Sequence, residues 1–324
     1  MKQKPLGIFM IKCKEMIQLI SSAWVGLLFF GFITSGSVLG AEKTSDIKYL
    51  YSFKTNRSAC MLRVNDVPIL DTFGHNEESI TTGGNITSFS ENGTNVIEVM
   101  MGPISPKKMD TLYTDSFCEL IVTKATANSS RHVTTMKLTV DDNKKIIASS
   151  SSNYKGLSDE GPIDETQLPY NKEQDLYRIA RNVKFSGLPE WSWQTARPVT
   201  NADLPEIRKV YTQIWTAMKN RDVDTLRKMT EISSREMGIA SGLLPDFIFR
   251  SYNLPQEVSS PERRIVDLKW EGKELITYCN GRLFRLAQGV YQNSPLKLQN
   301  KDGKVVFTYN PYLSIINGKV VIVR

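Results

Sequence analysis

Apolar residues recur at helical spacing in one stretch of the chain, residues 203–237. The positions that share one face of an amphipathic helix include Ile207, Val210, Ile214 and Met218. The pattern starts again after Asp222, so the stretch predicts a pair of helices. Around this pair, the apolar residues follow the shorter period of β-strands.

The helix pair carries two predicted start signals. Asp203 with Glu206 three residues later resembles a capping box, and Pro205 lies where a missing N–H is tolerated. Asp222 precedes the second helix and is a favoured N-cap residue.

Short apolar runs, separated by Asn, Asp and Gly, fill residues 47–198. Runs at this spacing predict an antiparallel β-sandwich. The expected strands are Ala59–Val64, Val67–Leu70, Ile86–Phe89, Val96–Met101, Cys118–Lys124, His132–Val140, Lys145–Ser149 and Leu176–Phe185. The polar stretch 149–172 is expected to be a long loop.

After the helix pair, residues 242–250 predict a short helix, and turn signals then punctuate a strand meander. Asn-Gly and Asp-Gly pairs favour tight hairpins, because both turn positions need positive φ. The expected strands are 264–270, 274–279, 283–287, 304–309 and 320–323. One curved sheet wrapped over the helix pair is an α+β roll. We therefore expect a β-sandwich domain at 41–198 and an α+β roll at 199–324.

The N-terminal segment has the features of an export signal. Lysines precede the apolar run 23–33, and the small-residue pattern before Ala41 fits a cleavage site, which predicts a signal peptide at 1–40. The run is short for a membrane span, although an uncleaved single-helix anchor is the alternative. The predicted location is the periplasm.

Removal of this segment also changes the charge. The whole chain has a formal net charge of +7. Residues 1–40 contribute four lysines and one glutamate, so a chain that begins at Ala41 has 37 basic and 33 acidic residues, a net charge of +4. This excess is too small to argue for nucleic acid as a partner.

Three cysteines remain after Ala41. Cys60 and Cys118 each lie in a predicted strand, and two strand cysteines in an oxidising compartment predict a disulfide. Cys279 would then remain as a buried thiol.

Two resemblances bear on the fold. The run from Val210 to Leu226, a helix followed by a polar turn and an Asp-apolar-Asp step, resembles the opening helices of the NTF2-like superfamily. That resemblance implies a pocket between sheet and helices, used variously for catalysis, ligand binding or subunit contacts. The runs 62–70 and 92–99 resemble jelly-roll or carbohydrate-binding sandwiches. Fold alone does not choose a function.

The search for catalytic chemistry gives no residue set. The sequence has two histidines, His75 and His132, and it lacks zinc-protease, Cys-x-x-Cys, phosphate-loop and Gly-x-Ser-x-Gly motifs. Two Ser-x-x-Lys matches, at 105–108 and 152–155, lie in predicted loops without the accompanying motifs. His75 is best explained as a solvated loop residue. No metal or cofactor is expected.

Asp222 and Asp224 are the acid/base candidates of an enzymatic interpretation, since pocket carboxylates can have raised pKa values. Their position at a helix start favours capping instead.

Aromatic residues give the predicted binding set. Trp191 and Trp193 point to the same side of an extended segment, as a platform for sugar or protein, or as packing between the two domains. Tyr211, Trp215 and Tyr252, with Phe247 and Phe249, either line the pocket of the roll or belong to its core.

These observations favour an exported, non-enzymatic binding protein. The leading hypothesis is a protein partner, with an immunity protein that neutralises a periplasmic toxin as the specific form. A cell-envelope carbohydrate- or peptidoglycan-binding protein that uses Trp191 and Trp193 is the alternative. A hydrolase or isomerase that uses Asp222 or Asp224 is the third. Membrane contact is expected only through the export signal.

Overall fold

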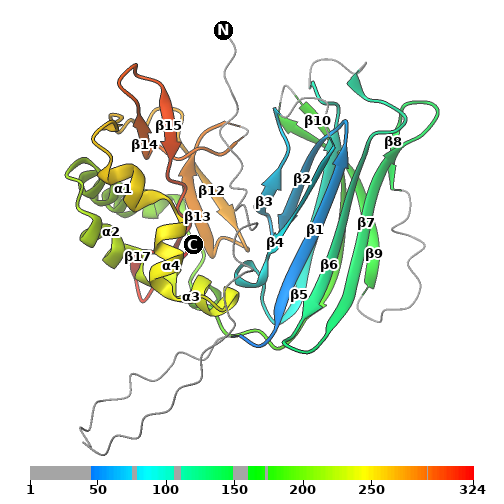
Figure 1. Ribbon diagram of the computed structural model, residues 1–324, viewed down its shortest axis with the longest axis horizontal. Coiled ribbons are helices and arrows are strands. Elements are labelled where there is room, and N and C mark those ends of the chain that lie inside the picture. Colours follow the sequence, from blue (N-terminus) through cyan, green and yellow to red (C-terminus); the bar gives the residue numbers. More distant parts are fainter. Residues whose placement is uncertain (1–44, 75–78, 106–110, 149–159, 172–173, 290) are drawn as a thin grey trace, which may run out of the picture. The chain divides into compact units, whose positions relative to one another are not determined.

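Two five-stranded antiparallel sheets form the first part of the fold, seen as two layers of long strands in Figure 1. One has the order β4-β1-β6-β7-β8 and the other β3-β2-β5-β10-β9. The strands are β1 (Lys48–Asn56), β2 (Ala59–Val64), β3 (Val67–Asp71), β4 (Ile80–Asn85), β5 (Gly93–Gly102), β6 (Phe117–Ala125), β7 (Ser130–Val140), β8 (Ile146–Ala148), β9 (Glu160–Asn171) and β10 (Gln174–Phe185).

The computed structural model describes residues 45–74, 79–105, 111–148, 160–171, 174–289 and 291–324. The predicted signal peptide, its cleavage site before Ala41, His75 and the Ser-x-x-Lys match at 152–155 lie outside the described residues, as does most of the match at 105–108. Residues 44–324 belong to one compact unit. The predicted boundary at 198/199 falls between two short 3-10 helices, η3 (Ser192–Thr195) and η4 (Asn201–Asp203).

The two sheets share a hydrophobic core. In β6, Cys118, Leu120 and Val122 are buried while the residues between them are partly exposed. This period of two directs one side of each strand inward, and a single apolar cluster takes residues from both sheets. The antiparallel strands predicted from the sequence are confirmed here, and the arrangement fits a β-sandwich.

Two sequence predictions in this part are wrong. Residues 86–89 do not form a strand: Thr87–Phe89 is a 3-10 helix, η1. The Thr87 N–H donates to the Asn85 side chain at 2.9 Å, a local bond that competes with strand pairing. Residues 160–171 form β9 instead of a loop. Its two prolines obscured it in the sequence, but a sheet edge tolerates proline.

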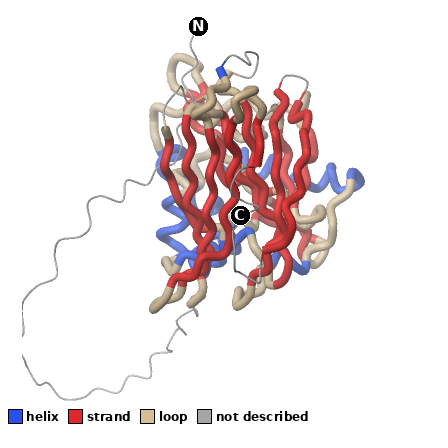
Figure 2. Tube along the Cα trace, turned by 90° about the vertical axis from the view of Figure 1, so that its right-hand side faces the viewer, coloured by secondary structure: helices blue, strands red, loops and turns tan. Residues whose placement is uncertain are grey.

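Helices and two smaller sheets follow among the described residues after β10 (Figures 1 and 2). The helices are α1 (Leu204–Lys219), α2 (Val223–Met229), α3 (Glu231–Ser241), α4 (Pro245–Ser251) and α5 (Leu254–Ser259). The sheets have the orders β11-β14-β15 and β12-β13-β16-β17. Their strands are β11 (Arg264–Ile265), β12 (Glu274–Tyr278), β13 (Leu283–Ala287), β14 (Lys297–Gln299), β15 (Val305–Thr308), β16 (Leu313–Ile316) and β17 (Lys319–Ile322).

Helix α1 follows the predicted pattern. Its apolar face is buried in a cluster that includes residues of β13 and β14. The predicted start differs in detail, because the Asp203 carboxylate turns back to accept from the Thr200 N–H at 2.8 Å and pairs with Arg197. The side chain of Asp203 therefore makes no cap on α1.

The strands after the helices form two sheets where one was expected. Pro295 and Pro311 interrupt the segments that would have to join them, and neither residue can donate to a strand ladder. The predicted turn at Asn317-Gly318 is confirmed. Asn317 and Gly318 both have positive φ, 49° and 75°, and connect β16 to β17 by a two-residue turn. Among the described residues, no helix is both long and apolar enough to cross a membrane.

Candidate functional site

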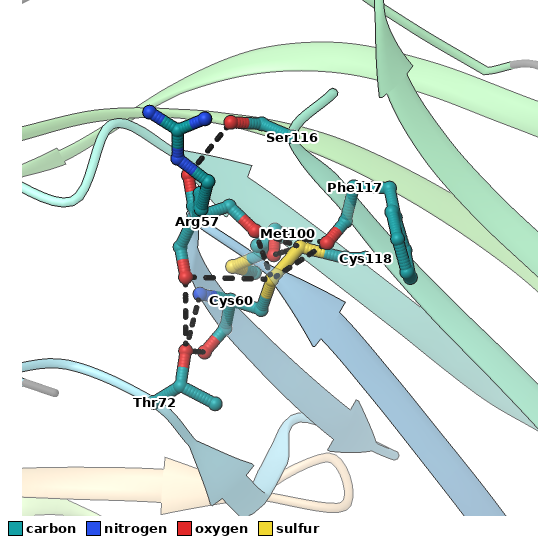
Figure 3. The surroundings of a disulfide bond; sticks show 8 residues. Arg57, Cys60, Thr72, Met100, Ser116, Phe117 and Cys118 are labelled. Atoms are coloured by element: carbon teal, nitrogen blue, oxygen red, sulfur yellow. Dashed lines mark hydrogen bonds between the residues drawn. A yellow bond between two sulfur atoms is a disulfide. The ribbon is translucent and has the colours of Figure 1, made fainter. Parts of the chain in front are cut away.

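The predicted disulfide is present. Cys60 in β2 and Cys118 in β6 are bonded, with their Cα atoms 6.1 Å apart, so the bond joins the two sheets of the sandwich (Figure 3). The Cys60 N–H donates to the Thr72 hydroxyl at 2.9 Å, and the Ser58 hydroxyl donates to the Phe117 carbonyl at 2.9 Å. The bond indicates an oxidising compartment.

Trp191 and Trp193 are buried, with 1% and 0% of their surface exposed. The indole N–H groups donate to the carbonyls of Ser90, at 2.9 Å, and Ser88, at 3.1 Å. The segment is a 3-10 turn and not an extended strand. The rings therefore cannot form the proposed sugar-stacking platform, and they pack between η1 and the C-terminal elements, in agreement with the alternative interpretation.

The other predicted binding aromatics also lie inside the protein. Tyr211 is fully buried, and its hydroxyl accepts from the Leu286 N–H at 3.0 Å. Trp215 is partly buried and donates to the Val266 carbonyl at 2.8 Å, while the Tyr252 hydroxyl lies 2.6 Å from that of Ser233. Their placement matches the core interpretation. Of this group, Phe247 is the residue that is well exposed, at 56%.

The carboxylates proposed for acid/base chemistry lie on the surface. Asp222 caps α2 by accepting from the Thr225 N–H at 2.9 Å. The Thr225 hydroxyl also donates to this carboxylate, and the two hydrogen bonds lower the pKa of Asp222. Asp224 is exposed. A surface carboxylate with a lowered pKa lacks the property of a general acid or base. Burial lowers the pKa of His132, whose Nε2 lies 2.7 Å from the Thr135 hydroxyl.

A buried ion pair that the sequence analysis missed joins the C-terminal strand region to α3. The Arg324 Nη1 donates to the Glu236 carboxylate at 2.6 Å, with 1% and 6% of the two side chains exposed. Arg324 Nε donates to the Ser88 carbonyl at 2.9 Å, and its guanidinium lies 5.3 Å from the Trp191 ring centroid. Glu236 also accepts from the Ser192 N–H at 2.8 Å. We call these residues the Arg324 cluster.

A second buried arginine lies among tyrosines. Arg285, in the middle of β13, is 5% exposed, and its guanidinium lies 4.7 Å from the Tyr312 ring centroid and 5.6 Å from that of Tyr278. Its Nη2 donates to Gln292 Oε1 at 3.0 Å, and that oxygen also accepts from the Tyr278 hydroxyl. These four residues form the Arg285 cluster.

The outer face of the sheet β3-β2-β5-β10-β9 also carries charge. Glu98, which is 2% exposed, lies between Arg63 and Arg178, with the Arg63 Nη1 at 3.6 Å from its carboxylate. The positive charge of Arg63 also lowers the pKa values of Tyr278 and Tyr312, although burial raises both more strongly.

Apolar side chains are exposed at the start of α4. Leu243, Leu244 and Phe247 are 44%, 76% and 56% exposed. We call these three residues the 243–247 patch. The backbone beneath them is held firmly: Gly242 has φ +73°, and the N–H groups of residues 242 and 243 both donate to the Gly238 carbonyl, at 2.8 and 3.0 Å.

Charged residues surround the patch. Asp246 accepts from both Arg227 and Arg250, the latter at 2.7 Å, and the hydrogen bond from Arg227 lowers the pKa of the carboxyl. Two guanidiniums share one carboxylate, so this surface carries a positive excess beside its apolar residues.

No group of three or more potential metal ligands occurs within the described part of the chain. A scan against models of known protein families gives no match, and a search of curated proteins finds no similar sequence.

The sequence did contain a signal for both missed arginines. Arg285 interrupts the apolar run Leu283–Ala287, and Arg324 follows Val320–Val323. A charge inside an apolar strand indicates a buried ionic site. Leu243 and Leu244 are adjacent apolar residues, and this spacing does not fit one face of a helix.

Proposed function

We propose that this protein is an exported, non-enzymatic binding protein whose partner is another protein. The observation that carries the proposal is the 243–247 patch. Adjacent exposed leucines and a phenylalanine on firmly held backbone are unusual for a surface without a partner. Aromatic and aliphatic side chains flanked by arginines are typical of the anchors of protein interfaces.

Rigid presentation supports this interpretation. Pro245 begins α4, and the Gly242 cap ends α3, so the connection between the helices has little conformational freedom to lose on binding. The partner would present an apolar recess with a carboxylate at its rim, complementary to Arg227 and Arg250.

A membrane surface is the competing target of an apolar patch with nearby cations. Asp246 argues against it. This carboxylate lies in the sequence between Leu244 and Phe247 and already neutralises one of the two guanidiniums. A protein interface accommodates such an ion network at its rim, whereas an anionic bilayer repels the carboxylate.

The proposal also includes a compartment and a specific class of partner. The disulfide and the N-terminal sequence support export, with the periplasm as the proposed compartment. The specific form, an immunity protein that neutralises a toxin, and the NTF2-like and jelly-roll resemblances are supported by the sequence features described above. The carbohydrate-binding alternative has lost its main support because Trp191 and Trp193 are buried.

Affinity capture from the periplasmic extract of the native host, followed by affinity measurement with the purified partner, tests the proposal. The variant Leu244→Asp/Phe247→Asp disrupts the patch, and Ile147→Asp is the matched control, because Ile147 is an exposed apolar residue in β8. We expect one stoichiometric protein, bound equally by the wild type and the control and at least about 30-fold more weakly by the double variant.

Two results would contradict the proposal. Equal binding by all three proteins would remove the patch from the interface. Capture of no protein, together with binding to anionic lipid vesicles that the double variant loses, would assign the patch to a membrane surface. If a toxin is the partner, the purified protein must also suppress its activity.

A further inference from the structure

Arg285 is a buried cation without a carboxylate partner in the described structure. The residue is 5% exposed, and no acidic side chain lies within 4 Å of its guanidinium among the described residues. Its contacts are the amide oxygen of Gln292 and the faces of two tyrosine rings. Arginine remains protonated in proteins, so a full positive charge is held there.

Such an arrangement is costly unless an anion completes it. An ionised group transferred from water to the interior loses several kcal/mol of solvation, and partners of opposite charge usually offset that loss. The Arg324 cluster shows the usual solution in this same protein, since Glu236 neutralises the guanidinium. The Arg285 cluster has tyrosines in the corresponding place, and they supply ring faces and hydroxyls but no negative charge at neutral pH.

The hydrogen-bond donors of this cluster are not all satisfied within the described residues. Arg285 Nε is buried and has no hydrogen-bond acceptor within the described residues. The ring of Tyr312 lies against the same guanidinium, and its hydroxyl is a further donor. The Tyr278 hydroxyl and Arg285 Nη2 already share Gln292 Oε1. Arg63 lowers the pKa values of both tyrosines, but its own charge is offset by Glu98, whose carboxylate lies 3.6 Å from the Arg63 Nη1.

Gln292 adds a backbone observation. It has φ +46°, in the left-handed region that residues with a Cβ seldom adopt. Gln292 lies in the turn between Gln288 and Asn293, where its N–H donates to the Gly289 carbonyl at 2.9 Å. Its side-chain oxygen accepts from both Arg285 and Tyr278.

We propose that the Arg285 cluster is a binding site for one oxyanion group, a carboxylate or a phosphate. The Arg285 Nε and the Tyr312 hydroxyl would donate to the anion. A guanidinium edge offers parallel N–H groups that match two oxygens of either anion. This site is separate from the 243–247 patch, and it stands independently of the proposed protein partner.

NMR of arginine side chains in the full chain tests the site directly. The Nε–H cross-peak of Arg285, assigned by its loss in Arg285→Met, is followed while sodium phosphate or sodium acetate replaces sodium chloride at constant ionic strength. The Arg324 Nε–H cross-peak is the internal control, because it already donates to the Ser88 carbonyl.

We expect a saturable shift of the Arg285 cross-peak and none of the Arg324 cross-peak. The variant Tyr312→Phe removes one donor and should weaken binding about tenfold. A response to phosphate alone or acetate alone supports the site and identifies the anion. The absence of a saturable shift with both salts would overturn the proposal, as would unchanged affinity in Tyr312→Phe.

Discussion

Arg324 and Arg285 are two arginines in similar buried surroundings, but among the described residues only Arg324 pairs with a carboxylate. Both are more than nine-tenths buried, and both lie against aromatic rings. Arg324 has a carboxylate at 2.6 Å, whereas Arg285 has an amide oxygen and tyrosines. Each retains one buried nitrogen without a partner among the described residues, so hydrogen bonding alone does not separate them. The difference is the missing negative charge.

A buried charge that is paired within the fold has a structural role, whereas a buried charge without a counterion is available to a ligand. Arg324 links α3, η1 and the strand region through Glu236 and Ser88, so its interactions are satisfied within the fold. Burial lowers the pKa of Arg324 and Glu236 acts against that shift. Arg285 has no such counterion in the part of the chain that the structure describes, and a bound anion would neutralise its charge. Stability should therefore depend on Arg324 and ligand response on Arg285.

The largest effect should come from breaking the paired arginine. Arg324→Met leaves Glu236 buried without its cation, which should lower the free energy of unfolding by about 3–5 kcal/mol. Urea unfolding followed by tryptophan fluorescence measures the change. The double variant Arg324→Met/Glu236→Gln removes the stranded charge and should recover part of the loss. If the single variant is as stable as the wild type, the ion pair is not a structural link.

A variant without the disulfide is destabilised but keeps both arginines, so it serves as a control for general loss of stability. Cys60 and Cys118 are separated by 58 positions, so Cys60→Ala/Cys118→Ala should lower the free energy of unfolding by about 2–4 kcal/mol, because the unfolded chain gains conformational entropy. Calorimetry in chloride measures the loss of stability, and the same measurement in phosphate gives the response to the anion. The variant should keep the phosphate response of the wild type, and loss of that response would show that general destabilisation suffices to abolish it.

Cys279 reports on opening of the apolar cluster that contains Trp191 and Tyr278. Burial raises the pKa of its thiol to about 12, with Arg282 acting in the opposite direction. Little thiolate therefore exists at pH 8, and alkylation should be negligible in the native protein. Mass mapping of alkylated peptides distinguishes Cys279 from Cys13. Arg324→Met should accelerate labelling of Cys279, while Arg285→Met should not; equal rates would remove the contrast between the two clusters.

The smallest effect should come from Asp222, on the surface. Its hydrogen bonds to the Thr225 side chain and N–H lower its pKa below that of the unfolded chain. The carboxylate therefore stabilises the folded protein above about pH 4, and that contribution is lost as pH falls through the lowered folded-state pKa. Asp222→Ala should have a slightly lower Tm than the wild type at pH 7 and the same Tm in strong acid. Asp224→Ala, next to it but without a hydrogen bond among the described residues, is the control.

The sequence was most informative where one local rule governs structure. Periodicity located α1 and most of the sandwich strands, Asn317-Gly318 located a hairpin, and two strand cysteines located the disulfide. The helix, the strands and the hairpin each depend on neighbours in the chain, and the disulfide follows from the residue type and its predicted strand setting. The sequence failed where partners are distant: β9 owes its strand conformation to pairing with β10, and Trp191 is buried by η1, about a hundred residues earlier.

The candidate sites show the same division. Arg285 was visible as a charge inside an apolar run and Arg324 as a charge directly after one, but the sequence cannot tell which of them has a carboxylate nearby. Glu236 and Arg324 are 88 positions apart. Tyr312 and Arg285 are brought together by pairing of β13 with β16. The contrast between the two clusters is therefore a property of the fold.

The most direct test of that contrast is urea unfolding of the wild type, Arg285→Met and Arg324→Met in chloride and in phosphate at equal ionic strength. Phosphate also stabilises proteins generally, and Arg285→Met reports that background. We predict that Arg285→Met stays within about 1 kcal/mol of the wild type in chloride and shows only the background response to phosphate. Arg324→Met should lose stability in both salts and keep the full response. A wild-type response of Arg285→Met to phosphate would contradict the anion site, and a lower stability of Arg285→Met than of Arg324→Met in chloride would contradict the structural role of Arg324.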